Sequence, residues 1–173
     1  MNKAVFLDRD GTINVDKEYV HKVEDLEFIP GVLEALAKLA KTDYRIIIIT
    51  SQSGIGRGYY TQNDYEIFTK NMLNKIKRNG GRIDAVYFCP HSPDAGCDCR
   101  KPKPKMILDA ARDFNIDLSK SYMIGDKRAD MIMGDNAGCK KIRVMTGKGE
   151  KSDADYTAKD LADAIDAIIN KKV

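Results

Sequence analysis

The stretch Arg45-Ile46-Ile47-Ile48-Ile49-Thr50 decides the fold class of this chain. Four consecutive isoleucines with no polar residue between them are typical of a strand that is buried on both faces, as in a parallel sheet covered by helices. On either side of it, short apolar runs alternate with segments whose apolar residues recur at helical spacing. This alternation predicts an α/β fold, a three-layer sandwich with a central, mainly parallel sheet.

The polar residues at the strand ends predict where a ligand would bind. Further strands are expected at residues 4–7, 85–88, 122–124 and 141–145. Helices are expected at residues 32–40, 65–76, 107–114 and 161–168, with a short helix closed by Gly138. Asp8, Thr50 and Asp126 lie at the carboxyl ends of their predicted strands, the edge where open α/β sheets bind ligands. We therefore expect these three residues to share one crevice.

Size and composition narrow the class of protein. A chain of 173 residues without repeats or long linkers suits a single domain, here residues 1–173. The net charge of +3 does not call for a nucleic-acid partner. The longest aliphatic run, Ile46–Ile49, is too short to cross a bilayer, and the first residues lack a signal-peptide pattern. We expect a cytoplasmic protein with no membrane partner, acting as a monomer.

The segment Phe6-Leu7-Asp8-Arg9-Asp10-Gly11-Thr12 delivers two carboxylates from a buried strand into a glycine-containing turn. Carboxylates this close in sequence can share a divalent cation such as Mg²⁺, which prefers hard oxygen ligands. They can also divide the chemistry, with Asp8 or Asp10 attacking and the other moving a proton. The plainer alternative is a simple strand-to-turn exit, where Asp and Gly are common.

Three more motifs carry polar groups to the ends of strands or to the loops beside them, and each has a plainer alternative. Thr50-Ser51-Gln52-Ser53-Gly54 can hold phosphate oxygens or cap a helix. Cys99-Arg100-Lys101-Pro102 can offset phosphoryl charge and grip a second anion, or be a solvated basic pair. In the segment Gly125–Asp130, the carboxylate of Asp126 can complete a magnesium site, whereas Asp130 can orient a metal-bound water or serve the helix dipole.

A cysteine and histidine cluster forms a second candidate metal site. Cys89, His91, Cys97 and Cys99 lie within eleven residues, 89–99. Three thiolates and one imidazole suit a closed tetrahedral Zn²⁺ site, and a closed site is structural because it leaves no position for water. The alternatives are a disulfide, disfavoured in a chain without a secretory signal, and chance clustering. Cys139 lies far along the chain and is expected to be a small buried residue.

Taken in order, the four motifs resemble those of the haloacid dehalogenase superfamily, and the resemblance runs from Phe6 to about Thr146. It implies a Rossmann-like sheet and a phosphatase that works through a phospho-aspartyl intermediate at Asp8. No segment of the chain is long enough to form a separate cap domain. Asp10 would be the general acid and base, and Thr50 and Lys101 would steady the transferring phosphoryl group. Mg²⁺ would be bound by Asp8, the backbone carbonyl of Asp10, and Asp126.

The zinc loop before Arg100-Lys101-Pro102 resembles that of the heptose bisphosphate phosphatases, which remove the 7-phosphate of D-glycero-D-manno-heptose 1,7-bisphosphate in nucleotide-activated heptose biosynthesis. The histidinol-phosphate phosphatases of histidine biosynthesis share this loop. The substrate-binding residues that this resemblance implies are Asp16, Tyr19, Ser51, Gln52, Ser53, Arg100 and Lys127. Arg100 and Lys127 would hold the phosphate that stays on the product.

Two points qualify the resemblance. Ser51 stands where the family commonly has asparagine, so its reach toward substrate is shorter. His21, at the end of the candidate substrate-facing stretch Asp16–His21, is interpreted as a surface residue. The alternative functions are a histidinol-phosphate phosphatase and a zinc-stapled phosphate-binding protein without turnover, which would need neither nucleophile nor proton shuttle.

Overall fold

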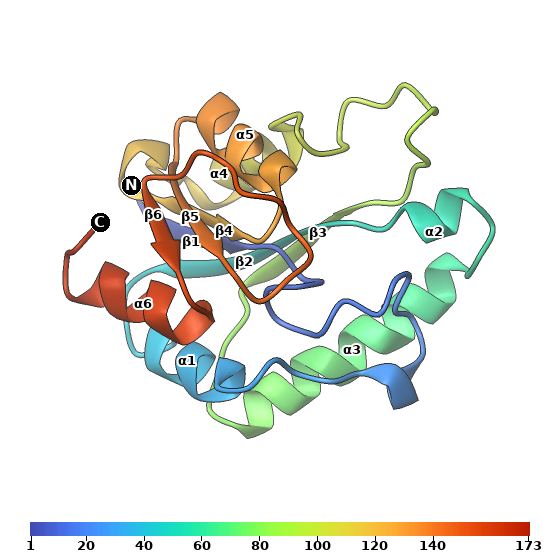
Figure 1. The fold of residues 1–173 in the computed structure, drawn as a ribbon, viewed down its shortest axis with the longest axis horizontal. Coiled ribbons are helices and arrows are strands. Elements are labelled where there is room, and N and C mark those ends of the chain that lie inside the picture. The colour runs from blue at the N-terminus through green and yellow to red at the C-terminus, as the bar shows by residue number, and fades with distance from the viewer.

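The computed structural model describes residues 1–173 and is built around one six-stranded sheet (Figure 1). The strands are β1 (Ala4–Leu7), β2 (Arg45–Ser51), β3 (Ala85–Cys89), β4 (Tyr122–Gly125), β5 (Lys140–Val144) and β6 (Tyr156–Ala158). Their order across the sheet is β3-β2-β1-β4-β5-β6, and every neighbouring pair is parallel. The predicted, mainly parallel sheet is confirmed, and it is parallel throughout.

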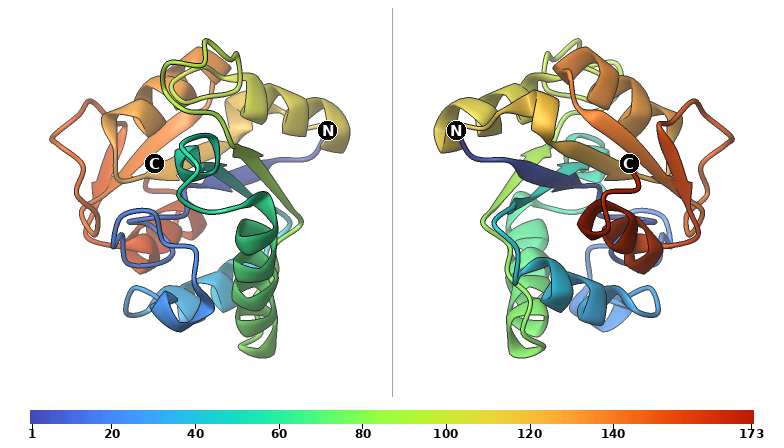
Figure 2. Two further views of the ribbon diagram at one scale, coloured as in Figure 1. Left: turned by 90° about the vertical axis from the view of Figure 1, so that its right-hand side faces the viewer. Right: turned by 90° about the vertical axis from the view of Figure 1, so that its left-hand side faces the viewer.

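Helices cover both faces of the sheet. They are α1 (Val32–Leu39), α2 (Ser53–Gly56), α3 (Gln62–Arg78), α4 (Lys105–Phe114), α5 (Arg128–Ala137) and α6 (Leu161–Ile169), with 3₁₀ turns η1 (Val23–Asp25) and η2 (Leu118–Lys120). One face is covered by α1, α3 and α6, and the other by α4 and α5 (Figures 1 and 2). This arrangement confirms the three-layer α/β sandwich. None of the helices combines the length and apolar character needed to traverse a bilayer.

The isoleucines of β2 divide between the two cores of the sandwich. Ile46 and Ile48 point into the core formed with α1, α3 and α6, whereas Ile47 and Ile49 point into the core formed with α4 and α5. All four are fully buried. Because successive side chains of a strand point to opposite faces, only a strand with helices on both sides needs such a run. Each isoleucine contributes about 1.5–3 kcal/mol of hydrophobic stabilisation.

Two short elements were not predicted. β6 has three residues and pairs with the edge of β5, with Ile142 opposite Tyr156. α2 has four residues and follows β2 directly. Neither is long enough to show a periodic pattern in sequence, so both depend on the neighbouring structure. The boundaries of the predicted elements otherwise agree with the observed ones to within a few residues.

The topology brings the ends of β1 and β4 together. The chain proceeds from β1 to β2 and β3 on one side, and then returns to place β4 on the other side of β1. Leu7 is opposite Ile124, and the Asp8 N–H donates to the Ile124 carbonyl at 2.9 Å. Asp8 and Asp126 therefore leave the sheet side by side, at the reversal of strand order where ligands bind in open α/β sheets.

Candidate active site

A cavity of about 460 Å³ opens at this edge of the sheet. The predicted residues that line it are Asp8, Asp10, Asp16, Tyr19, Ser51, Gln52, Ser53, Arg100, Lys101 and Lys127. Thr50 and Asp126 are buried rather than part of the lining. The Thr50 hydroxyl nevertheless accepts a hydrogen bond from the Gln52 amide at 2.8 Å, and a carboxylate oxygen of Asp126 lies within 4.8 Å of one from Asp8. The structure therefore brings the separate motifs into one place.

Lys101 is the cation at the centre of the site. Its ammonium group donates to Asp8 Oδ1 at 2.6 Å and to Asp130 Oδ1 at 2.7 Å. Burial alone would lower the pKa of Lys101, but the charges of Asp130 and Asp8 outweigh burial and raise it. The side chain therefore stays charged beside Asp8, where an incoming phosphoryl group would need its charge offset.

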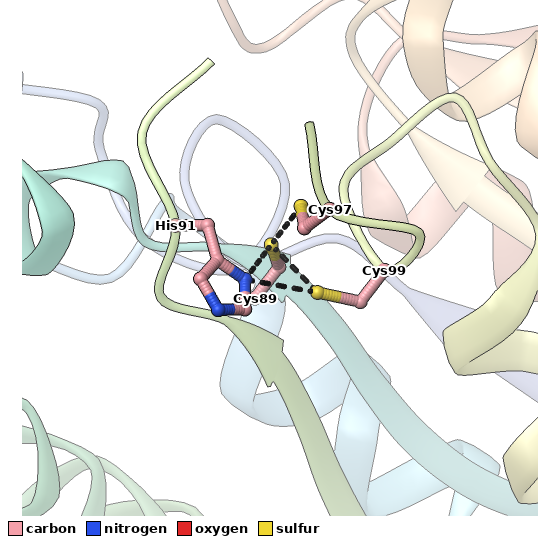
Figure 3. Close-up of side chains that lie close together, drawn as sticks. All are labelled: Cys89, His91, Cys97 and Cys99. Atoms are coloured by element: carbon pink, nitrogen blue, oxygen red, sulfur yellow. Dashed lines mark hydrogen bonds between the residues drawn. The ribbon is translucent and has the colours of Figure 1, made fainter. Parts of the chain in front are cut away.

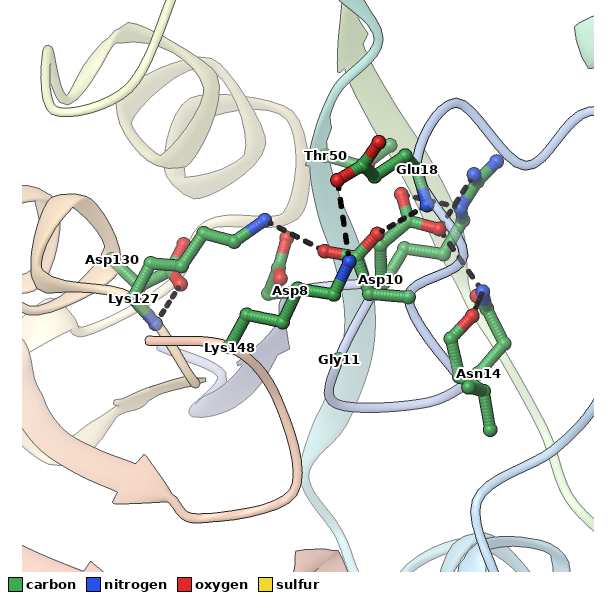
Figure 4. A network of polar contacts seen from close by, with 12 residues as sticks. Asp8, Asp10, Gly11, Asn14, Glu18, Thr50, Lys127, Asp130 and Lys148 are labelled. Atoms are coloured by element: carbon green, nitrogen blue, oxygen red, sulfur yellow. Dashed lines mark hydrogen bonds and ion pairs between the residues drawn. The ribbon is translucent and has the colours of Figure 1, made fainter. Parts of the chain in front are cut away.

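Asp130 serves the helix N-terminus, one of the two interpretations that the sequence left open for it, and has a further contact that was not predicted. Its Oδ2 accepts a hydrogen bond from the Lys127 backbone N–H at 3.0 Å, which caps the start of α5. Its other oxygen holds Lys101. One carboxylate thus stabilises the helix N-terminus, through the contact with Lys127 that Figure 4 shows, and also orients the central cation.

The carboxylates around Lys101 have the character of a divalent cation site. Asp8, Asp126 and Asp130 offer oxygens within 4.8 Å of one another, and all three residues are buried. Lys101 pairs directly with two of these carboxylates, and the charge of Lys127 also acts on Asp126. Burial is the main cause that raises the pKa of Asp8 and of Asp126 above the ordinary range.

The carboxylate of Asp126 supports the same interpretation. Both of its oxygens are buried without a hydrogen-bond partner, a costly state for a charged group. A hard cation such as Mg²⁺ takes ligands of this kind and would satisfy the unpartnered oxygens. The residues present therefore fit a bound Mg²⁺.

Asp10 occupies a different environment, in which every contact favours its charged form. Arg9 donates to both of its oxygens, at 2.8 and 3.1 Å, while Asn14 donates at 3.0 Å and Gln52 at 3.2 Å (Figure 4). Burial alone would raise the pKa of Asp10, but Arg9 and the hydrogen bonds lower it. No role was predicted for Arg9. Its position directly after a buried strand was nevertheless a signal, because a charged residue at such a position needs a buried partner.

The rim of the cavity is formed by the Asp16–His21 segment together with aromatic side chains. Tyr19 packs edge-on against Tyr59, with ring centroids 4.8 Å apart. His21 does not line the cavity, which agrees with its interpretation as a surface residue, but its ring stacks on Tyr60 at 4.6 Å and is half-buried. Tyr60 is a cavity-lining residue that sequence reasoning missed, and its hydroxyl donates to the Gln52 side-chain carbonyl at 2.6 Å.

Two ion pairs span the mouth of the cavity. Lys127 lies 3.3 Å from Asp16, and Lys148 lies 3.5 Å from Glu18. Glu18 also lines the cavity and was not predicted. Neither pair is buried on both sides, so each holds the segment only weakly and leaves its lysine available to an anionic ligand.

The cysteine and histidine cluster lies just beyond the end of β3 (Figure 3). The sulfur of Cys89 lies 3.6 Å from His91 Nδ1, 3.6 Å from the sulfur of Cys97 and 3.0 Å from that of Cys99. With Zn–S bonds of about 2.3 Å, tetrahedral ligands lie about 3.8 Å apart. The four donor atoms therefore already surround a volume of the right size for Zn²⁺, and the cysteines form no disulfide.

The loop 89–99 leads directly into Arg100 and Lys101, the two cations that it positions on the cavity wall. None of the residues 89–99 lines the cavity, whereas Arg100 and Lys101, which follow the loop directly, do. One Arg100 guanidinium nitrogen, Nη1, is buried without a partner. Elsewhere in the chain, Cys139 is buried as predicted, and burial raises the pKa of its thiol to about 12.

The fold and the site define a hydrolase of the haloacid dehalogenase class, and a family model described as "HAD-hyrolase-like" matches residues 98–168. The D-glycero-beta-D-manno-heptose-1,7-bisphosphate 7-phosphatase of Helicobacter pylori strain 26695 is 45% identical over 96% of this chain and 98% of its own. That of Escherichia coli K12 is 42% identical over 95% of this chain and 93% of its own. The chain belongs to the D-glycero-beta-D-manno-heptose-1,7-bisphosphate 7-phosphatase family, and the predicted enzyme class, a phosphatase of the haloacid dehalogenase superfamily, is confirmed.

Solved structures of similar proteins agree with this assignment. The chain matches the D,D-heptose 1,7-bisphosphate phosphatase of B. bronchiseptica, complexed with magnesium and phosphate, with a TM-score of 0.91, 32% identity and coverage of 98% of this chain and 99% of the other. It matches the corresponding protein of Burkholderia thailandensis with a TM-score of 0.74, 31% identity and coverage of 97% and 99%.

Proposed function

We propose that this protein is a Mg²⁺-dependent phosphatase that removes the 7-phosphate of D-glycero-D-manno-heptose 1,7-bisphosphate through a phospho-aspartyl intermediate at Asp8. The observation that carries the proposal is the contact of Lys101 with Asp8 on the cavity wall, next to the buried and unpartnered carboxylate of Asp126. The names of the relatives point to the same substrate.

The first step transfers the phosphoryl group to Asp8. A carboxylate oxygen of Asp8 attacks phosphorus as the bond from phosphorus to the sugar oxygen breaks. Asp10 donates a proton to that leaving oxygen, because an alkoxide is a poor leaving group unless it is protonated. Lys101 and the Thr50 hydroxyl stabilise the charge that spreads over the phosphoryl oxygens.

The second step frees the enzyme. Asp10, now ionised, takes a proton from a water molecule, and the water oxygen attacks the phosphorus of phospho-Asp8. The bond from Asp8 to phosphorus breaks and inorganic phosphate leaves. The contacts of Asp10 lower its pKa, which suits this base role, so the proton that Asp10 donates in the first step has to be taken up when the substrate binds.

Two metals complete the proposal. Asp8, Asp126 and the backbone carbonyl of Asp10 would hold Mg²⁺, which when bound polarises the phosphoryl oxygens and reduces their repulsion of the Asp8 carboxylate. Cys89, His91, Cys97 and Cys99 would hold a structural Zn²⁺. The zinc loop would thereby fix the chain from which Arg100 and Lys101 project.

A second anion-binding position favours a bisphosphate over a monophosphate. The Arg100 nitrogen without a partner and the Lys127 ammonium both belong to side chains on the cavity wall, apart from the contact of Lys101 with Asp8. Together they would hold the phosphate that remains on the product. Histidinol phosphate has one phosphate and would leave this position unused.

The test is release of inorganic phosphate from heptose bisphosphate and from histidinol phosphate, each with and without Mg²⁺. We expect Mg²⁺-dependent turnover, preference for the bisphosphate, and no turnover by Asp8→Asn. Binding of either ligand without phosphate release would instead indicate a non-catalytic phosphate-binding protein. Preference for histidinol phosphate would overturn the substrate but leave the enzyme class intact.

A further inference from the structure

Arg9 lies between two functional segments of the site and is almost fully buried, with 1% of its surface exposed. Its guanidinium donates to both carboxylate oxygens of Asp10, from Nη2 at 2.8 Å and from Nε at 3.1 Å. The same Nη2 donates to the backbone carbonyl of Val20 at 2.8 Å. One side chain therefore links Asp10 to the end of the cavity-rim segment.

An aromatic ring and the two acceptor groups restrict the position of this guanidinium. Its central carbon lies 4.6 Å from the centre of the Phe68 ring, so the cation rests on an aromatic face contributed by α3. A planar fork that contacts both oxygens of a carboxylate fixes the orientation of that carboxylate as well as its distance. Lysine, a point charge on a flexible stem, cannot reproduce these contacts together.

The orientation of the Asp10 carboxylate depends on its side-chain partners. Its carboxylate is held only by side chains: Arg9, Asn14 and Gln52. Of these, Arg9 alone contacts both oxygens and carries a charge. Proton transfer to a leaving group requires the acid within about 2.6–3.2 Å of the accepting oxygen, so a small rotation of Asp10 would disable it.

We propose that Arg9 is a positioning residue that holds the Asp10 carboxylate in the geometry for proton transfer and ties it to the backbone at Val20. This inference rests on the proposed phospho-aspartyl reaction. The Arg9 side chain does not line the cavity and makes no hydrogen bond to the Asp8 carboxylate. It acts on the reaction only through Asp10.

This role predicts a dependence on the leaving group that a purely structural role would not produce. p-Nitrophenolate leaves without protonation, so formation of phospho-Asp8 from p-nitrophenyl phosphate does not need Asp10. Alkyl phosphates need it, as does hydrolysis of phospho-Asp8. In Arg9→Lys, the rapid burst of p-nitrophenol should change by less than about threefold. Phosphorylation by the sugar phosphate and the steady-state rate after the burst should each fall at least about tenfold.

The outcomes separate this inference from the proposed function. A burst in the wild-type protein that is absent in Asp8→Asn supports the phospho-aspartyl reaction by itself. With that burst present, an equal loss in burst and steady state for Arg9→Lys would overturn the positioning role. If Arg9→Lys does not fold, Arg9→Gln is measured in its place, because glutamine keeps one donor toward Asp10 without the charge or the planar fork. A retained burst with a lowered steady-state rate supports the inference, and an equal loss in both overturns it.

Discussion

Gly11 and Asp126 lie so close together that a β-carbon added at Gly11 would be 2.6 Å from Oδ2 of Asp126. Gly147, in the loop after β5, meets the same carboxylate from another direction, and a β-carbon there would also collide with it. Gly11 has a φ of +87°, which side chains disfavour. Backbone therefore surrounds Asp126 closely while both of its oxygens stay free of hydrogen bonds, as a metal ligand requires.

Substitution of Gly11 by alanine should weaken Mg²⁺ binding more than it weakens the fold. The new methyl group would displace the Asp126 carboxylate, and we expect the Mg²⁺ concentration for half-maximal activity to rise at least about tenfold. Gly31→Ala is the matched control, since Gly31 has a φ of +81° but no atom within 4 Å of the added carbon. Both variants should lose thermal stability, and an equal change in Mg²⁺ requirement would contradict the displacement of Asp126.

The stabilisation by Mg²⁺ should increase with pH. Burial, followed by the charge of Asp130, raises the pKa of Asp8, and burial also raises that of Asp126. A raised pKa in the folded protein contributes stability below the ordinary value of about 4, and this is lost as pH rises through the folded pKa. At higher pH the ionised carboxylates repel one another. A bound divalent cation would offset this repulsion, so its stabilising effect should grow as the pH rises.

The measurement is the rise in melting temperature on adding Mg²⁺ at a series of pH values from about 5 to 8. We expect the rise to be smallest at the acidic end and to disappear at every pH in Asp126→Asn. A rise that is the same at each pH would argue that these carboxylates are not the ones that bind the ion.

Removing the Arg100 guanidinium should affect substrates according to the number of phosphates they carry. Arg100→Ala should raise KM for the heptose bisphosphate about 10- to 100-fold, the range expected for a lost charged hydrogen bond. KM for a sugar monophosphate should change far less. Arg57→Ala removes the same charge from an exposed residue that does not line the cavity, and it should leave both KM values unchanged. Equal losses on both substrates with Arg100→Ala would count against a second phosphate position.

Loss of the zinc ligands should reduce both stability and activity, although the cluster does not line the cavity. Cys97→Ser should abolish bound zinc, measured by elemental analysis, and lower the melting temperature by several degrees. kcat should fall as well. Lys101 is only two residues after Cys99, so loss of the zinc would loosen the chain that positions Lys101. Cys139→Ala is the control for loss of a buried thiol and should keep its zinc. Full zinc content in Cys97→Ser would remove this cysteine from the ligand set.

Local patterns were sufficient to predict most of the fold. The isoleucine run of β2, the apolar spacing of α3 and the breaks at glycine are properties of neighbouring residues, so they can be recognised before any contact is known. β6 and α2 were not predicted, because they have only three and four residues. Elements this short form only where contacts with neighbouring structure stabilise them. The stacking of His21 on Tyr60 escaped prediction for the same reason, since it joins residues from separate loops.

The sequence by itself determined which residues stand at the ends of the strands, because strand period and turn chemistry are local. It thereby placed Asp8, Thr50 and Asp126 at one edge. Only the tertiary structure decided which atoms face one another there. Lys101 reaches Asp8 across 93 positions of the chain and also binds Asp130, while Arg9 turns away from Asp8 to hold Asp10. Such contacts depend on how the layers pack, and packing is set by the whole chain.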